Sequence, residues 1–172
     1  MVNGIDFRVF RDLSYGLYIV TSKDGDRLNG QLVNTVIQVT SEPPRIAVII
    51  NKQNLTHEFI EKSRVFAACV LDESVTMKFL GPFGFRSGRD VDKFAGLSYN
   101  EGVTGSPIVV EHVLSFAEAK VIDQMDLGTH TIFVGDVIGT GTLREGQPLT
   151  YRFYHENLKG KTPPNAPSYK PQ

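Results

Sequence analysis

Hydrophobic and polar positions follow a pattern that predicts mainly β-structure in the first half of the chain. Four runs are rich in β-branched and aromatic residues and are separated by turn-forming residues; they span 18–21, 27–40, 45–50 and 65–71. Asp24-Gly25 lies between the first two runs, which is a strong hairpin signal. We therefore expect a hairpin followed by one long strand over 27–40 and two strands buried on both faces.

The second half combines a helical insertion with long strands. Residues 74–106 carry short helical patterns at 77–80 and 91–94, separated by glycines. Long β-patterns return at 116–126 and 130–142, and Leu149, Tyr151 and Phe153 alternate with polar neighbours, as in a half-buried strand. Six or more strands without regularly intervening helices favour a closed β-barrel over a doubly wound parallel sheet.

The two ends of the chain carry weaker patterns. Phe7, Phe10 and Leu13 follow Asp6 at three-residue spacing, which predicts a short amphipathic helix. The segment from His155 is rich in proline and lysine and is not expected to form a packed element by itself. We expect one domain over residues 1–155 and a tail over 156–172.

Composition narrows the class of protein. The chain has 172 residues, 41% of them hydrophobic, and a formal net charge of −1. The length and hydrophobic content predict a single globular domain, and the near-zero net charge gives no support for nucleic-acid or membrane-surface binding. Cys69 is the single cysteine, which excludes an internal disulfide, and its buried strand indicates a core residue. Without a membrane span or signal-peptide pattern, we expect a cytoplasmic protein.

Several common catalytic motifs are missing from the sequence. No phosphate loop is present, Gly139-Thr140-Gly141 lies inside a β-pattern without the dinucleotide fingerprint, and four widely separated histidines lack metal-ligand spacing. No metal site is therefore expected. The segment from Asn51 to Thr56 joins a strand to a helix and offers a lysine, amides, a hydroxyl and helix-start N–H groups, which together suit a phosphate. The alternative is an ordinary helix capped by Asn54.

Four segments together resemble the flavin reductase-like family, and they occur in the family's order over roughly residues 15–155. They are Asn29-Gly30 with Val33 to Pro44, Val48 to His57, the Ser87-to-Phe94 sequence SGRDVDKF, and the Gly128-to-Asp136 sequence GTHTIFVGD. The resemblance implies a mainly β fold, an FMN-binding split β-barrel with a short helical insertion, assembled as a homodimer. It also implies a function: an FMN-dependent oxidoreductase that passes electrons from NADH or NADPH to a flavin, metal or protein acceptor.

The resemblance assigns candidate residues to the cofactor. The isoalloxazine ring and ribityl chain would contact Asn29, Asn34, Thr35, Val36, Ile37 and Gln38, and the phosphate would contact Asn51, Lys52, Asn54 and Thr56. Lys93 would reach the cofactor from the insertion, and His130 is the candidate catalytic residue beside the ring. Thr129 and Thr35 depart from the family pattern, which carries aspartate at the first position in many relatives and an aromatic residue at the second in some.

Other interpretations remain open at this point. Lys93 also suits a solvated ion pair, Gln38 a backbone contact in the barrel, and His130 a strand histidine bonded to a neighbour. One alternative function is a flavoredoxin-type electron carrier with little NAD(P)H activity, served by a rubredoxin or flavodiiron-type partner. The tail from His155 resembles a segment that precedes rubredoxin domains, which favours this alternative. A second is a split-barrel module that binds a ligand without catalysis.

Overall fold

The computed structural model describes residues 4, 6, 9–10 and 12–169. Its main sheet has seven strands in the order β2-β1-β5-β8-β9-β4-β3, and every pairing is antiparallel. The elements are β1 (Tyr18–Asp24), β2 (Arg27–Val33), β3 (Val36–Ser41), β4 (Pro44–Asn51), α1 (Leu55–Ser63), β5 (Val65–Leu71), α2 (Met77–Phe85), β6 (Tyr99–Glu101), β7 (Pro107–Val109), β8 (Val113–Asp126), β9 (His130–Thr142) and α3 (Tyr151–Glu156). β6 and β7 form a separate two-stranded sheet.

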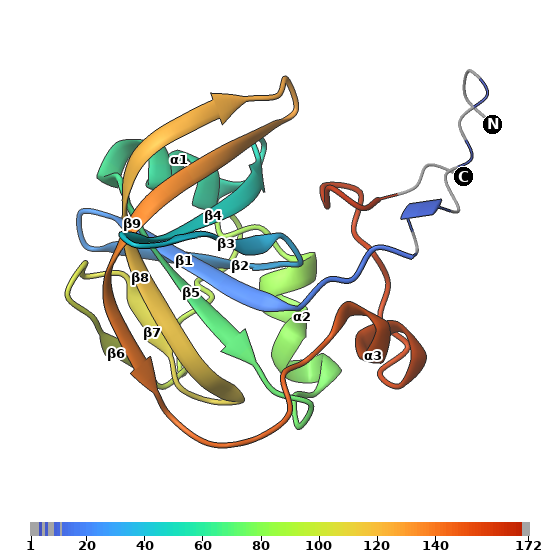
Figure 1. The fold of residues 1–172 in the computed structure, drawn as a ribbon. Helices are drawn as coiled ribbons and strands as arrows, with labels where there is room; N and C mark the ends of the chain where they lie inside the picture. The colour runs from blue at the N-terminus through green and yellow to red at the C-terminus, as the bar shows by residue number, and fades with distance from the viewer. Residues whose placement is uncertain (1–3, 5, 7–8, 11, 170–172) are drawn as a thin grey trace.

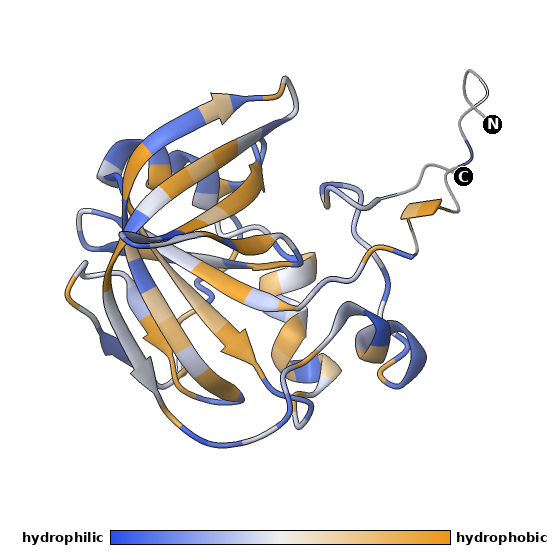
Figure 2. Cartoon of the chain, in the orientation of Figure 1, coloured by the Kyte–Doolittle hydropathy of each residue, from blue (hydrophilic) through white to orange (hydrophobic). Residues whose placement is uncertain are grey.

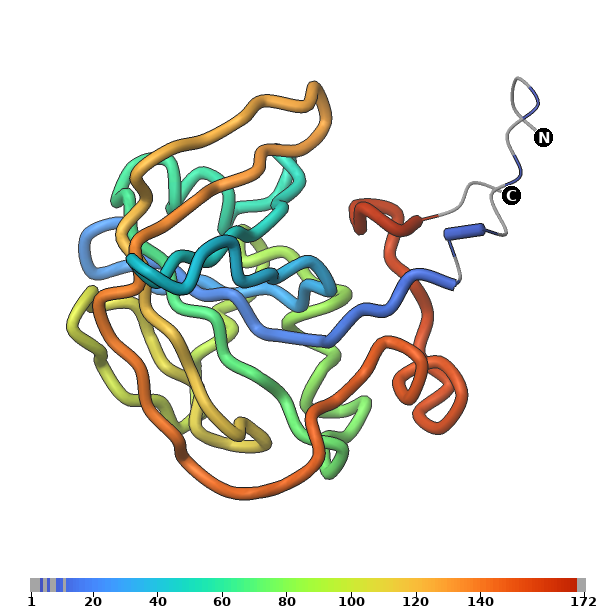
Figure 3. Tube along the Cα trace, viewed as in Figure 1, coloured from blue at the N-terminus to red at the C-terminus, as the bar shows by residue number. Residues whose placement is uncertain are grey.

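The sheet curls into a split barrel with its helices outside the strands (Figure 1). The β8–β9 hairpin is the longest ladder and projects from the barrel body, as Figures 1 and 3 show. One hydrophobic cluster, around Phe66, Phe133 and Ile60, packs α1 against the sheet, and a second, around Leu80, Phe83 and Tyr154, packs α2 and α3. Figure 2 shows orange and blue positions mixed along these strands, as expected where one strand face is buried. The expected mainly β barrel with a short helical insertion is confirmed.

The predicted single strand over 27–40 is wrong, because the run is two strands. β2 pairs with β1, whereas β3 pairs with β4, and Asn34 and Thr35 lie between them. Thr35 fixes the break through backbone and side chain: its carbonyl accepts from the Ile49 N–H, and its Oγ1 donates to the Ile49 carbonyl, both at 3.2 Å. Continuous β-propensity cannot show that a strand changes partners within one run.

Residues 149–153 do not form the expected strand. Thr150 Oγ1 accepts a hydrogen bond from the Phe153 N–H at 3.1 Å and begins α3 at Tyr151, so local capping overrides the alternating pattern. The helical pattern at 91–94 is a turn, and the insertion also contains the unpredicted β6 and β7. In the N-terminal segment, Phe7 lies outside the described residues, while Phe10 and Leu13 are exposed and belong to no α-helix.

The segment after α3 folds back along the barrel on the side of α2 (Figures 1 and 3). It contains no helix or strand over 157–169, yet it is held by specific contacts. Tyr154 Oη donates to the Lys161 carbonyl at 2.9 Å, and Asn34 Nδ2 donates to Ser168 Oγ at 2.8 Å. The sequence pattern predicted a tail without a packed element from His155, whereas His155 and Glu156 belong to α3 and the segment after them is held on the barrel by these contacts.

Candidate functional site

A cavity of about 600 Å³ lies between the barrel and the C-terminal segment. Its walls come from β2, the end of β4, the start of α1, the end of α2 with the following loop, and α3 with residues 161–167. This volume falls in the range of pockets that hold cofactors and other small molecules. Six of the predicted cofactor residues line it: Asn29, Asn34, Asn51, Asn54, Thr56 and Lys93.

The start of α1 opens into the cavity without a side-chain cap. Asn54 is the N-cap residue in extended conformation, but its side chain makes no capping hydrogen bond, and Asn51 Oδ1 instead accepts from the Gln53 N–H at 2.9 Å. The N–H groups of Leu55 and Thr56 have no hydrogen-bond acceptor among the residues that the structure describes. Free N–H groups and the helix dipole favour an anion here. Asn54 is therefore the N-cap residue, as predicted, but its side chain does not cap the helix, which leaves the helix start available to a phosphate.

Asn29 and Thr56 join β2 to the start of α1. Both are buried, and Asn29 Nδ2 donates to Thr56 Oγ1 at 2.9 Å, which leaves the Thr56 hydroxyl hydrogen free to donate to a ligand. Gly88, from the loop after α2, packs against Asn29 and Leu55 so closely that a Cβ there would lie 2.1 Å from Asn29 Oδ1. Glycine is thus required at this position for the loop to approach the site.

Gln31 is a site residue that the sequence analysis did not select. It lines the cavity two residues after Asn29 on β2, is 9% exposed, and its Oε1 has no hydrogen-bond partner. A buried amide oxygen without a partner costs about 1–3 kcal/mol, so such a group suits a ligand donor. The signal was present in the sequence: residues at i and i+2 of a strand share a face, and Asn29 was already assigned to the site.

The cavity wall is electropositive. Among the described residues it contains Arg86, Lys93 and Lys161 but no aspartate or glutamate. Lys93 Nζ donates to the Gly30 carbonyl at 2.8 Å, and burial lowers the pKa of this lysine to about 8. No carboxylate pairs with Lys93 among the described residues, so the alternative of a solvated ion pair does not hold. An unpaired buried ammonium favours an anionic or electron-rich ligand.

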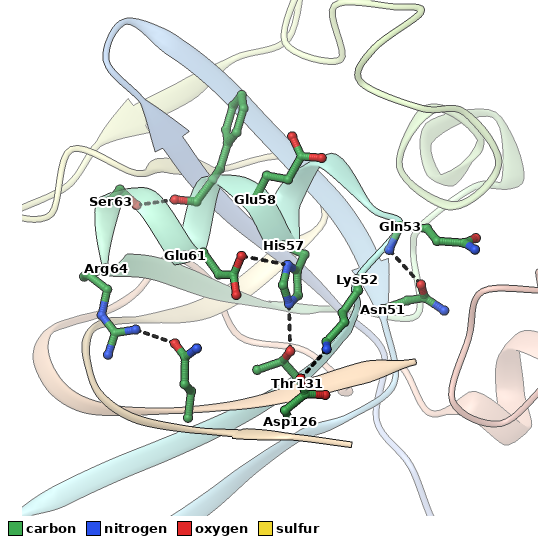
Figure 4. A network of polar contacts seen from close by, with 12 residues as sticks. Asn51, Lys52, Gln53, His57, Glu58, Glu61, Ser63, Arg64, Asp126 and Thr131 are labelled. Atoms are coloured by element: carbon green, nitrogen blue, oxygen red, sulfur yellow. Dashed lines mark hydrogen bonds and ion pairs between the residues drawn. The ribbon is translucent and has the colours of Figure 1, made fainter. Parts of the chain in front are cut away.

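Lys52 and His130 do not line the cavity. Lys52 Nζ forms an ion pair with Asp126 of β8, away from Gln53 and Asn51, as Figure 4 shows. His130 begins β9; its Nδ1 contacts Thr129 Oγ1 at 2.9 Å, and its Nε2 contacts the carbonyl of Asn165 at 3.3 Å. Because Asn165 does line the cavity, His130 lies just behind the wall that the C-terminal segment provides.

The break between β2 and β3 directs Thr35, Val36, Ile37 and Gln38 away from the cavity. Val36 packs against the core, Ile37 is 59% exposed, and Gln38 Nε2 donates at 3.4 Å to the Thr40 carbonyl and Ser41 Oγ. None of the four lines the cavity of this chain. Their assignment to the cofactor stays a prediction that requires a second subunit or a different course of the ligand.

The fold and the site together define a class: a split-barrel protein with an electropositive cavity that meets an uncapped helix start. Comparison with known proteins identifies the family. Residues 10–158 match the family model described as "Flavin reductase like domain". The chain belongs to this family, so the predicted resemblance and the class of flavin-dependent oxidoreductase are confirmed.

Individual relatives agree with this assignment. The chain is 48% identical over 165 residues to a high molecular weight rubredoxin of Moorella thermoacetica, covering 96% of this chain and 72% of that protein. It is 46% identical over 165 residues to a ferric-chelate reductase (NAD(P)H) of Archaeoglobus fulgidus, covering 96% and 98%. Among solved structures it resembles the flavin reductase HpaC complexed with NADP+, with a TM-score of 0.72 and 27% identity, covering 84% of this chain and 89% of that one.

Proposed function

We propose that the protein holds FMN in the cavity and passes electrons from NADH or NADPH through it to an acceptor. The observation that carries the proposal is the uncapped start of α1, which opens into a cavity whose lining, within the part of the chain that the structure describes, has three cations and no carboxylate. A flavin mononucleotide combines an anionic phosphate with a planar ring whose carbonyl oxygens and ring nitrogens accept hydrogen bonds, so its charge and shape match this wall. The NAD(P)H-dependent ferric-chelate reductase and the NADP+ complex of the flavin reductase support the same reaction type.

The residues present fit the cofactor at both ends. The N–H groups of Leu55 and Thr56, with the Thr56 hydroxyl and the amides of Asn51 and Asn54, would hold the phosphate. The unpartnered Gln31 Oε1 and the Lys93 ammonium would face the ribityl chain or ring. The flavin supplies the hydride and electron chemistry; the protein binds and orients it and excludes water.

The visible spectrum of the purified chain tests the proposal. We expect about one equivalent of FMN per chain and bleaching of its absorbance on anaerobic addition of NADH or NADPH. FMN should bind more tightly than riboflavin, because hydrogen bonds to a charged phosphate contribute more than neutral ones. Equal affinity for the two flavins in a fluorescence titration would remove the phosphate assignment, and a chain that takes up neither flavin would contradict the function.

The homodimer is proposed on an apolar outer face of the sheet. Register places Ile37, Ala47 and Val134 in one row across β3, β4 and β9, and Ile49, Ile132 and Met125 in a row across β4, β9 and β8. Ile37 and Met125, at the ends of the two rows, are 59% and 60% exposed; Ile49, Ile132 and Val134 are half-buried, and Ala47 is buried. Exposed apolar residues on one sheet face suit an interaction site, and two-fold pairs are the commonest oligomers. Ile49 also lines the cavity, so a second subunit on this face would lie beside the cofactor.

A protein acceptor is a second candidate partner. The similarity to a high molecular weight rubredoxin supports a rubredoxin-type acceptor, beside the ferric acceptor that the similarity to a ferric-chelate reductase supports. In that case the chain would act as a flavoredoxin-type carrier, and its slow step would be electron delivery to the partner. Reduction of ferric citrate, free FMN and a rubredoxin by the NADH-reduced protein, compared at equal concentration, separates these acceptors.

No helix among the described residues has the length and apolar character needed to cross a membrane. Among the same residues, no cluster of three histidine, cysteine or acidic side chains is arranged to bind a metal ion.

A further inference from the structure

The segment 161–168, which we call the C-terminal strap, is a structural part of the cavity. Residues 161–167 line it, opposite the wall formed by β2 and the start of α1. The family match ends at residue 158, so the strap lies beyond the part of the chain that the family model describes. The family model therefore does not account for its position.

The strap is attached at both of its ends. At its root, Tyr154 Oη donates to the Lys161 carbonyl, and Gly160 fits against the Tyr154 ring so closely that a Cβ there would lie 2.0 Å from the ring. At its far end, Ser168 Oγ accepts from Asn34 Nδ2 and donates to Tyr151 Oη at 3.1 Å. Tyr151 Oη also contacts Thr162 Oγ1, so this tyrosine joins both parts of the strap.

The middle of the strap contacts two candidate site residues through Asn165. Its Nδ2 donates to Asn54 Oδ1 at 3.3 Å, and its carbonyl lies 3.3 Å from His130 Nε2. These are long, weak hydrogen bonds. The ends of the strap are held firmly and its middle only weakly. The middle can therefore separate from Asn54 and His130 while the ends stay attached, as a wall that opens requires.

The cavity volume shows whether the strap fills the site or only covers it. With the strap in place, about 600 Å³ remains between it and the barrel, which is enough for a cofactor-sized ligand. A strap that filled the site would leave no such volume. We propose that the C-terminal strap is the outer wall of the flavin site and retains the flavin as a bound cofactor, so that release requires the strap to lift. This inference rests on the proposed function, since it takes FMN as the ligand.

The test measures the dissociation rate of FMN from the full chain and from strap variants. Each FMN-loaded protein is mixed with a large excess of a flavin-free FMN-binding protein as a trap, and flavin fluorescence or absorbance follows release. Truncation after Gly160 should raise the dissociation rate at least tenfold, and Asn165→Ala about three- to tenfold. Asn157→Ala is the matched control: its side chain makes no hydrogen bond with the described residues, so the rate should not change.

Gly160→Ala provides a second route if the truncated chain does not fold. The added Cβ forces Tyr154 and the strap root apart without removing any residue, and circular dichroism establishes that the barrel is intact. Rates within twofold of the parent for both Asn165→Ala and Gly160→Ala would overturn the strap assignment. Tighter FMN binding after truncation would also overturn it, because the strap would then be a competitor. If the full chain binds no FMN, the proposed function fails instead.

Discussion

Replacing Lys93 by methionine tests how the cavity is charged. The lysine is 8% exposed, its ammonium donates to the Gly30 carbonyl, and burial lowers its pKa from 10.5 to about 8. A difference of this size corresponds to about 3 kcal/mol against the charged form in the folded state. Methionine removes that cost together with one hydrogen bond to the charged lysine, which contributes about 1.5–3 kcal/mol. At pH 7 the flavin-free variant should therefore be as stable as the parent or up to about 2 kcal/mol more stable.

The pH dependence separates this effect from general repacking. The folded chain releases the Lys93 proton near pH 8, while the unfolded chain holds it to about pH 10.5, so the unfolded state binds more protons in this window. The free energy of unfolding of the parent should therefore rise by about 3 kcal/mol relative to Lys93→Met between pH 8 and pH 10.5. Comparing the two proteins cancels the tyrosines and Cys69, which titrate in both.

Urea unfolding of the flavin-free proteins, followed by circular dichroism at half-unit pH steps, gives these differences. Lys62→Met is the control, because Lys62 is an exposed lysine paired with Asp24, and its curve should run parallel to the parent. Parallel curves for Lys93→Met and the parent would show that the ammonium is not desolvated, and the inference that Lys93 is a buried, unpaired cation in the cavity would be wrong. With FMN bound, Lys93→Met should also show weaker affinity, by about 1–3 kcal/mol.

The remaining predictions concern cofactor binding, turnover, assembly and acid stability. Thr56→Ala should weaken FMN by about 1–3 kcal/mol while reduction at saturating FMN stays near normal. His130→Ala should slow reduction by NAD(P)H more than it weakens FMN; stopped-flow reduction at the parent's rate would remove its catalytic role. Met125→Glu should shift sedimentation from dimer to monomer, and a monomeric parent would contradict the proposed interface. His57 contacts Thr131 at 2.8 Å, and burial lowers the pKa of His57 in the folded chain. As the pH falls, the unfolded chain therefore takes up the His57 proton before the folded chain does, and the free energy of unfolding should decrease below about pH 6.5. His57→Gln should flatten that fall in urea unfolding.

Local pattern predicted the elements whose residues interact mainly with their own strand or helix. β5 and β9 lie at their predicted bounds, and α1 begins where Asn54 was expected to precede it. The Asn34–Thr35 break and the start of α3 at Thr150 were missed, because each depends on a partner or a capping bond that periodicity does not contain. β6 and β7 were missed because three-residue strands are too short to show a period.

The residues of the candidate site also fall into those that local sequence predicted and those that it missed. Residues at the junction of β4 and α1 were predicted from the chemistry of a helix start, and Asn51, Asn54 and Thr56 do line the cavity. Lys52 belongs to the same segment, but its long side chain forms an ion pair with Asp126, 74 residues further along the chain, and does not line the cavity. The strap was predicted as an unpacked tail, because its prolines exclude helix and strand but do not exclude tertiary contacts such as that of Ser168 with Asn34.

Ile49 belongs both to the cavity wall and to the apolar outer row of β4. Flavin on one side and a second subunit on the other would therefore both fix the position of the same side chain. In thermodynamic terms, two ligands that share a residue are coupled, and the coupling is reciprocal: each strengthens the other by the same factor. Flavin affinity would then depend on protein concentration across the range in which subunits associate, and dilution would weaken both interactions together.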